Sequence, residues 1–308
     1  MTERQVPALV WALMGLLALI WGGSFPANRL ALAEMGVLTT VAIRICLGAT
    51  VMWSLVALRG APLPRRPGVW GRIAVTGLLN TALPFSLIVW GQTRIDSGLA
   101  AILNASTAIF GVLVAALVFR DERLGARRGT GVALGFLGVA TVIGPARLAA
   151  FDPTSAGQLA VLAAAMCYAV AGSIGRGISR STAPEVAAAG TLTAAAAVVL
   201  PLALIVEGLP ARLPAPSVLG ALGYLGLVAT GAAYLVFFRI LRLAGAGTTS
   251  LVTLMVAPVG ILLGALIFGE TLPLRAYGGF ALLAAGLIVI DGRFLPRLYR
   301  PLPPRPRI

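Results

Sequence analysis

Ten apolar stretches of about 20 residues each constrain this 308-residue chain more than any other feature of its sequence. A helix needs roughly 20 apolar residues to cross the hydrocarbon of a bilayer. The stretches are continuously apolar rather than alternating, which predicts membrane-spanning helices and not the strands of a barrel. We therefore expect an all-α membrane protein with ten transmembrane helices, over residues 8–30, 37–58, 70–90, 98–119, 129–145, 157–174, 183–206, 218–238, 248–268 and 277–290.

Few residues remain for a soluble domain, and the residue types argue against an enzyme. Only 11% of the residues are charged, whereas a soluble domain carries about 25%. The chain has no His, and its two cysteines, Cys46 and Cys167, lie inside apolar stretches. We expect no catalytic residues, no metal site, no cofactor and no disulfide framework. The first stretch resembles a signal peptide but lacks a cleavage site, so we expect it to stay as the first helix.

The basic residues predict how the chain crosses the membrane. The net charge is +14 and every basic residue is Arg. The arginines lie between apolar stretches, which favours contact with anionic lipid headgroups over nucleic acid. Of the 24, 18 fall in one set of alternate connections and the two termini, five fall in the other set, and Arg44 lies inside a stretch. The positive-inside rule places the larger set, and so both termini, in the cytoplasm. An even number of spans is consistent with this.

The two halves of the chain repeat each other. Gly111 in the fourth stretch matches Gly260 in the ninth, 149 residues later, and Phe119 likewise matches Phe268. Further matches are GVALGFLG (131–138) with GFALLAAG (279–286), Glu122 with Glu270, Trp21 with Tyr168, and Arg29 with Arg176. We expect a first five-helix repeat over residues 1–150, a second over 151–292, and a cytoplasmic Pro- and Arg-rich tail over 293–308.

Because five is an odd number, the second repeat must enter the membrane from the opposite side. Secondary transporters often use such inverted repeats, whose halves rock around one site near the midplane. The alternative is a duplication that only builds a stable bundle. Stability alone gives no reason for inversion, so the repeat favours transport.

Several segments resemble one known family. These are LLALIWGGSFPANR (16–29), Arg44 in the second stretch, and the paired ends FRDERL (119–124) and FGETL (268–272), each followed by a glycine-spaced last helix. Over residues 8–292 the chain resembles the EamA-type ten-helix members of the drug/metabolite transporter superfamily. It is most similar to the YddG-type amino-acid exporters of bacterial inner membranes. The resemblance implies two five-helix halves around a central cavity, and export of amino acids or similar small metabolites.

Polar side chains inside apolar stretches are candidates for a substrate-binding site, because they are costly in a bilayer. Asn80 and Thr81 lie near the middle of the third stretch, and Thr230 is the repeat partner of Thr81. Asn104 in the fourth stretch has Thr253 as its partner. Each could bind an amino or carboxylate group of a substrate, or could equally form a hydrogen bond between helices.

Four aromatic residues form two further repeat pairs, Trp21 with Tyr168 and Phe85 with Tyr234. A cavity lined by them would suit apolar or aromatic substrate side chains through stacking and area burial. The alternative for a tryptophan is the aromatic belt at the membrane surface. Trp70 and Trp90, at opposite ends of the third stretch, fit that belt better than Trp21 does.

Two features bear on charge within the membrane. Arg44 could extend to the interface, or could pair with a substrate carboxylate or a neighbouring carbonyl. No Asp or Glu lies deep in a stretch, which predicts a uniporter or exchanger without the carboxylate relay of proton-coupled carriers. A single internal Arg disfavours phosphate-bearing substrates, although a carrier of drugs, nucleotide sugars or lipid-linked sugars stays the alternative. Monomer and homodimer are both open.

Overall fold

The computed structural model of the chain describes residues 8–118, 126–143, 153–175, 182–249 and 252–291. All secondary structure in these ranges is helical. The first half contains α1 (Ala8–Gly22), α2 (Ser24–Ala31), α3 (Val37–Arg59), α4 (Pro67–Gly77), η1 (Leu78–Ala82), α5 (Leu83–Gly91), α6 (Ser97–Asn104), α7 (Thr107–Val118) and α8 (Ala126–Ile143). The second half contains α10 (Pro153–Gly175), α11 (Pro184–Val206), α12 (Pro216–Gly223), η2 (Tyr224–Ala232), α13 (Ala233–Thr249), α14 (Val252–Phe268) and α15 (Leu274–Asp291).

These segments make up the ten predicted spans, so the expected all-α fold of two inverted five-helix repeats is confirmed. Several spans consist of consecutive pieces, namely α1 with α2, α4 with η1 and α5, α6 with α7, and α12 with η2 and α13. Over the described residues, six spans are long and apolar enough to cross a membrane, and three further apolar helices are shorter. The C-terminal tail predicted over 293–308 lies outside the described residues.

Local sequence explains several helix starts. A proline stands in the first turn of α4, α11 and α12, where its missing N–H costs nothing and its fixed φ suits a helix. The eighth span differs from the prediction at its end, since α13 continues to Thr249 instead of stopping at residue 238. Arginines at the end of the apolar stretch do not end a helix, because they are good helix formers.

The third and eighth spans each contain a π-helical segment at the same place in the repeat. Pro84 has no N–H, so the carbonyl of Asn80 loses its usual donor four residues later. The widened turn η1 lies at this point. Shifting η1 by the 149-residue offset places it inside η2, which has no proline. Both halves therefore interrupt the same helix, and π segments of this kind often mark functional sites.

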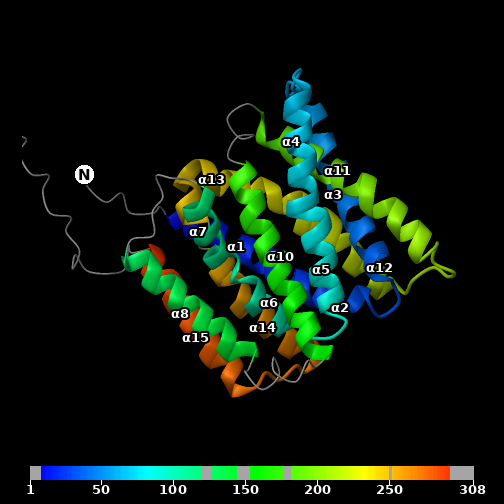
Figure 1. Cartoon of the computed structure of the whole chain (residues 1–308). Coiled ribbons are helices and arrows are strands. Elements are labelled where there is room, and N and C mark those ends of the chain that lie inside the picture. The colour runs from blue at the N-terminus through cyan, green and yellow to red at the C-terminus, as the bar shows by residue number, and fades with distance from the viewer. Residues whose placement is uncertain (1–7, 119–125, 144–152, 176–181, 250–251, 292–308) are drawn as a thin grey trace, which may run out of the picture.

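The helices pack in a pattern that stays the same when the two halves are exchanged. α8 packs against α15, and α3 packs against α11. In each of these pairs, one helix is the repeat counterpart of the other. α10 packs against α5 as α1 packs against α13, and α11 packs against α4 and η1 as α3 packs against η2. Figure 1 shows α8 and α15 side by side along one edge of the bundle. This two-fold pattern places the third and eighth spans, with their π segments, at the contact between the halves.

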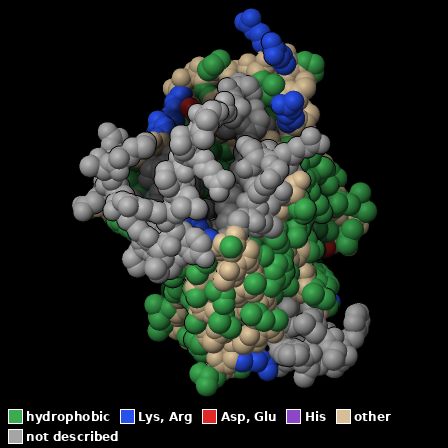
Figure 2. Space-filling model, turned by 60° about the vertical axis from the view of Figure 1, so that its left-hand side comes forward, with side chains coloured by type: hydrophobic (Ala, Val, Ile, Leu, Met, Phe, Trp, Pro, Cys, Tyr) green, Lys and Arg blue, Asp and Glu red, His purple; other side chains and the backbone are tan. Residues whose placement is uncertain are grey.

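The described surface is that of a protein surrounded by lipid. Figure 2 shows a face that is largely apolar over its middle, with the described arginines mostly toward its upper and lower ends. Exposed leucines and isoleucines are frequent, and Ile205 is 80% exposed and Leu266 72% exposed. A soluble protein rarely exposes such a large contiguous apolar area. In a bilayer the same surface is the favourable one.

Small residues let α8 and α15 approach until their backbones touch. A Cβ atom at Gly138 would lie 2.7 Å from the carbonyl oxygen of Gly279 and 2.7 Å from the backbone nitrogen of Leu283. Backbone atoms cannot rotate away as a side chain can. Close approach through glycine is a common way for membrane helices to associate.

We predict that Gly138→Ala lowers the thermal stability of the purified protein. Overpacking of this kind costs about 1–3 kcal/mol, which exceeds the roughly 1 kcal/mol gained by replacing a helical glycine with alanine. Gly111→Ala in α7 is the matched control, since no atom lies within 4 Å of a Cβ added there. Thermal unfolding in detergent should show a lower midpoint for the first variant only. Equal midpoints would contradict the close α8–α15 contact.

Candidate functional site

A buried arginine lies where the two halves meet. Arg44, in the first half of α3, is only 7% exposed. Its Nε donates a hydrogen bond of 3.0 Å to Oγ1 of Thr230 in η2. Its Cζ lies 4.0 Å from the ring centroid of Phe85 in α5, a cation–π contact. Arg44 does not extend to the membrane surface, so the interfacial alternative considered from the sequence is wrong.

The π segment η2 orients the threonine that meets this arginine. The hydroxyl of Thr230 donates to the carbonyl of Leu225, five residues earlier, at 2.8 Å. Its hydrogen is used there, so its oxygen is left to accept from Arg44. Gly48, one turn after Arg44, makes room for Thr230, because a Cβ at Gly48 would lie 2.5 Å from the methyl group of Thr230.

Three tyrosines of the second half lie within electrostatic range of the same guanidinium. They are Tyr168 in α10, Tyr224 in η2 and Tyr234 in α13. The hydroxyl of Tyr224 also donates to the carbonyl of Ile20 at 2.7 Å, at the break between α1 and α2. We call Arg44, Phe85, Tyr168, Tyr224, Thr230 and Tyr234 the arginine cluster.

A row of rings continues from the cluster to the first span. Tyr234 stacks on Phe238 with centroids 5.7 Å apart. Phe238 meets Phe237 edge to face at 5.6 Å, and Phe237 meets Trp21 of α1 at 5.9 Å. We call Trp21, Phe237, Phe238 and Tyr234 the aromatic row. Both repeats therefore contribute aromatic side chains to one place between them.

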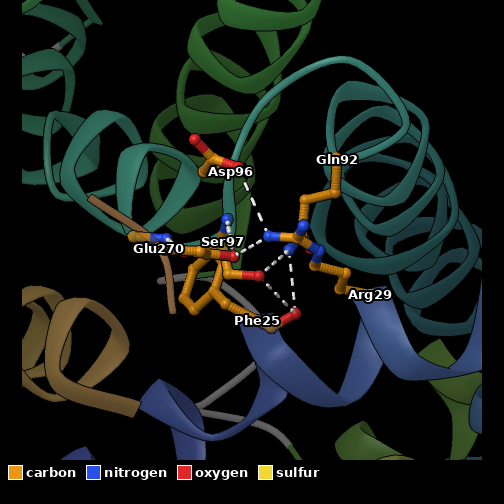
Figure 3. Close-up of polar contacts among 7 residues, drawn as sticks. Phe25, Arg29, Gln92, Asp96, Ser97 and Glu270 are labelled. Atoms are coloured by element: carbon orange, nitrogen blue, oxygen red, sulfur yellow. Dashed lines mark hydrogen bonds and ion pairs between the residues drawn. The ribbon is translucent and has the colours of Figure 1, made fainter. Parts of the chain in front are cut away.

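A second polar group ties the halves together at one end of the bundle (Figure 3). The carboxylate of Glu270, between α14 and α15, accepts hydrogen bonds from the backbone N–H groups of Ser97 at 3.1 Å and Gly98 at 3.0 Å. These are the first residues of α6, whose helix N-terminus favours a negative charge. Arg29 at the end of α2 forms an ion pair with the same carboxylate, and with Asp96 at 3.3 Å.

The same end carries two more carboxylates that cross between the halves. Glu207, after α11, accepts from the backbone N–H groups of Leu38 at 2.9 Å and Thr39 at 2.8 Å, at the N-terminus of α3. Glu34 accepts from the N–H of Ala215 at 2.9 Å. We call this end, with Glu34, Glu207 and Glu270, the capped end. At the opposite end, Arg59 forms an ion pair of 3.4 Å with Glu185, and this arginine is half exposed.

Buried side-chain amides form hydrogen bonds next to the capped end. Asn28, 1% exposed, donates from Nδ2 to Oε1 of Gln92 at 2.9 Å. Gln92 donates from Nε2 to the carbonyl of Phe25 at 2.8 Å (Figure 3). These bonds join α2 to the connection between α5 and α6, and so hold Arg29 and Ser97 in register with Glu270.

The pKa values of the two acidic groups beside Arg29 shift in opposite directions. Burial alone would raise the pKa of Glu270, but hydrogen bonds from Gly98, Ser97 and Arg29 outweigh it, so this pKa lies below its ordinary value. Burial, and then the negative charge of Glu270, raise the pKa of Asp96, which Arg29 only partly offsets. A carboxylate with a depressed pKa stabilises the fold above its ordinary pKa, and that contribution is lost as the pH falls through the depressed value. The Glu270 carboxylate is therefore fully ionised at neutral pH.

Similarity to known proteins identifies the family of the chain. The sequence profile of the EamA-like transporter family matches it twice, over residues 9–144 and 155–291. The chain belongs to the EamA-like transporter family. It is therefore a transporter embedded in a membrane, with a small-molecule substrate, and not an enzyme.

Two curated relatives of this EamA-like transporter span nearly its whole length. A protein of Streptantibioticus cattleyicolor named "Probable terminal-alkyne amino-acid exporter" is 32% identical over 294 residues, which are 94% of this chain and 95% of the relative. A protein of Salmonella typhimurium named "Probable amino-acid metabolite efflux pump" is 27% identical over 283 residues, 89% of this chain and 92% of the relative. A crystal structure with 22% sequence identity has the same fold, with a TM-score of 0.66 and coverage of 92% of this chain and 97% of that one.

Five of the nine site residues predicted for this EamA-like transporter meet in the structure. Phe85, Tyr168, Thr230 and Tyr234 belong to the arginine cluster, and Trp21 joins them through the aromatic row. The sequence also pointed to Arg44 as a charge inside an apolar stretch, but did not include it among the site residues. Tyr224, Phe237 and Phe238 were missed, because nothing in their spacing tells which face of the helix is turned inward.

The other four predicted residues belong neither to the arginine cluster nor to the aromatic row as defined above. Asn80 is half-buried in η1, and Thr81 is fully buried there with a hydroxyl that has no partner among the described residues. Asn104 ends α6, where the fourth span is interrupted, and its buried Oδ1 is likewise unpaired in the described part. Thr253 lies half-buried in the first turn of α14. These four remain candidates.

We predict that Glu270→Gln opens the capped end. The substitution removes the charge that holds Arg29 and the N-terminus of α6, and the Glu270 side chain that carries it is only 3% exposed. Leu99 lines hollows of about 350 and 500 Å³ beside this network. In a background with Cys46 and Cys167 replaced by alanine, Leu99→Cys should react with a water-soluble maleimide at least tenfold faster in the Gln variant.

The matched control for that experiment is Glu185→Gln, which removes the ion pair at the opposite end. It should leave the labelling rate of Leu99→Cys unchanged. An equal increase in both variants would mean general loosening of the bundle, and no increase in either would contradict a closing role for Glu270.

Proposed function

We propose that this EamA-like transporter exports amino acids, including aromatic and other apolar ones, across the bacterial inner membrane by alternating access. The observation that carries the proposal is the convergence of aromatic side chains from both repeats at one place between the halves. Trp21 and Phe85 come from the first half, and Tyr168, Tyr234 and Phe237 from the second. A site built by both halves changes its exposure when the halves rock against each other.

The relatives support the substrate class. Two proteins that align along nearly the whole chain carry names that refer to export of a terminal-alkyne amino acid and to efflux of an amino-acid metabolite. A row of rings suits an apolar side chain, since aromatic pairs stabilise beyond the area they bury. A phosphate-bearing sugar or nucleotide would need several cationic groups, and within its spans the sequence has one deep charge, Arg44.

The orientation follows from the arginine bias. Both termini are then cytoplasmic, and the capped end faces the outside. The three carboxylates at that end join the halves there, and their role in this proposal is to hold the carrier closed to the outside. Export then requires that these contacts separate while the opposite end is closed.

The coupling is that of a uniporter or exchanger. No Asp or Glu lies deep within a predicted span, and proton-coupled carriers commonly use an intramembrane carboxylate or His as the relay. Net export then follows the outward gradient of the amino acid itself.

Counterflow in proteoliposomes tests the proposal. Vesicles loaded with unlabelled phenylalanine should accumulate labelled phenylalanine from outside, with no ion gradient and with no change when a pH gradient is imposed. Trp21→Ala removes the ring that contacts Phe237 and should reduce the initial rate about tenfold, which corresponds to about 1.4 kcal/mol.

Trp11→Ala is the matched control in the same helix, because Trp11 is 44% exposed on the outer surface of the bundle. It should transport at the wild-type rate. No accumulation of phenylalanine, tryptophan, methionine or threonine by folded wild-type protein would refute amino-acid export, and a requirement for a pH gradient would refute uncoupled transport.

A further inference from the structure

We propose that Arg44 binds the carboxylate of the transported substrate. This inference rests on the proposed function and makes it more specific, since it requires a free carboxylate on every good substrate. The site then has two parts, the guanidinium of Arg44 for the carboxylate and the aromatic row for the side chain.

Arg44 has an incomplete set of hydrogen-bond partners among the described residues. Arg44 is 93% buried, and the one hydrogen bond it makes with the described residues uses Nε and a neutral acceptor, Thr230. None of the ion pairs in the described ranges involves it. A guanidinium has five N–H donors in a planar fork that matches a carboxylate. Its two terminal amino groups, Nη1 and Nη2, are therefore available for a bidentate pair.

The fold does not need a charge at the position of Arg44. Gly226 of η2 packs against the carbonyl oxygen of Arg44 and the Cβ of Leu47. Gly77, its repeat partner, packs in the same way against the carbonyl oxygen of Thr191 and the Cβ of Ala194. Thr191 in α11 thus occupies the place in the second half that Arg44 occupies in the first.

This second copy of the contact is built without a cation. The hydroxyl of Thr191 donates to the carbonyl of Ala188 in its own helix at 2.9 Å. Thr81, the repeat partner of Thr230, has a buried hydroxyl without a partner among the described residues. The same helix contact therefore forms with neutral residues, and a structural role alone does not account for the buried charge of Arg44.

The rings lie close to the guanidinium. The ring of Phe85 lies against it at 4.0 Å. Tyr234 belongs both to the arginine cluster and to the aromatic row. A carboxylate on Arg44 would place the substituent of an α-amino acid beside Tyr234 and Phe238. The charge and the apolar surface thus match the two ends of a single small substrate.

A substrate series in wild-type protein tests the inference without any variant. Phenylalanine should compete with labelled phenylalanine in counterflow at least tenfold better than phenylalaninamide, which keeps the ring and the amino group but has no carboxylate charge. Equal competition would overturn the role of Arg44 while leaving amino-acid export in place.

Variants of Arg44 locate the effect. Arg44→Gln should bind phenylalanine no better than phenylalaninamide, and its affinity for phenylalaninamide should equal that of wild type. Both affinities are measured by ligand-induced shifts of the unfolding temperature. Arg44→Lys keeps the charge without the planar fork and should recover part of the preference. Arg72→Gln, at an exposed position in α4, is the control and should behave as wild type. Retained preference in a folded Arg44→Gln protein would overturn the inference.

A failure of amino-acid export can be distinguished from a failure of carboxylate binding at Arg44. If wild-type protein transported no amino acid, phenylpropionate and phenylpropionamide would be compared as ligands in the same unfolding assay. A stabilisation by the acid alone, lost in Arg44→Gln, would support a carboxylate site on a different carrier. No difference between acid and amide would overturn it.

Discussion

A bilayer provides no water to the polar groups within it, and this constraint determines where charge can lie in the whole structure. Most arginines lie outside the predicted spans. The carboxylates of Glu207 and Glu270 occupy the N-termini of helices that belong to the other half. Arg44 is the exception, a charge held deep between the halves by one threonine and one aromatic face. This lack of a charged partner among the described residues is the reason for proposing a substrate site at Arg44.

The two halves are joined by contacts of two different kinds. Along α8 and α15 the halves touch backbone to backbone through glycines, a contact that tolerates little change. At the capped end they are joined by the side-chain carboxylates of Glu34, Glu207 and Glu270, not by close contact between helix backbones. The π segments η1 and η2 lie between these regions at the same place in each repeat. A firm contact along one edge, with separable contacts at the ends, suits a rocking motion.

The sequence predicted the architecture far better than the details of the site. Apolar runs, the arginine bias and the repeat are properties of whole segments, so they give the ten spans and their inversion without knowledge of packing. The inward face of a helix depends on its rotation, which one residue changes by about 100°. Asn80 and Thr81 are adjacent, yet one is half-buried and the other fully buried. Extension to the interface and burial of Arg44 are equally consistent with its place in the sequence, and only the neighbours Phe85 and Thr230 decide between them. The predicted partner of Glu270, Glu122, lies outside the described residues.

Distances across the two ends of the protein test the central claim, that the halves alternate about the arginine cluster. Spin labels at Thr93 and Thr271 would span the capped end, and labels at Arg65 and Arg239 the opposite end, all at exposed positions. Electron–electron double resonance in lipid nanodiscs would compare wild-type protein with Glu270→Gln, with and without phenylalanine. The account predicts that a longer distance at the capped end accompanies a shorter distance at the opposite end. Distances that lengthen together, or change at one end only, would contradict it.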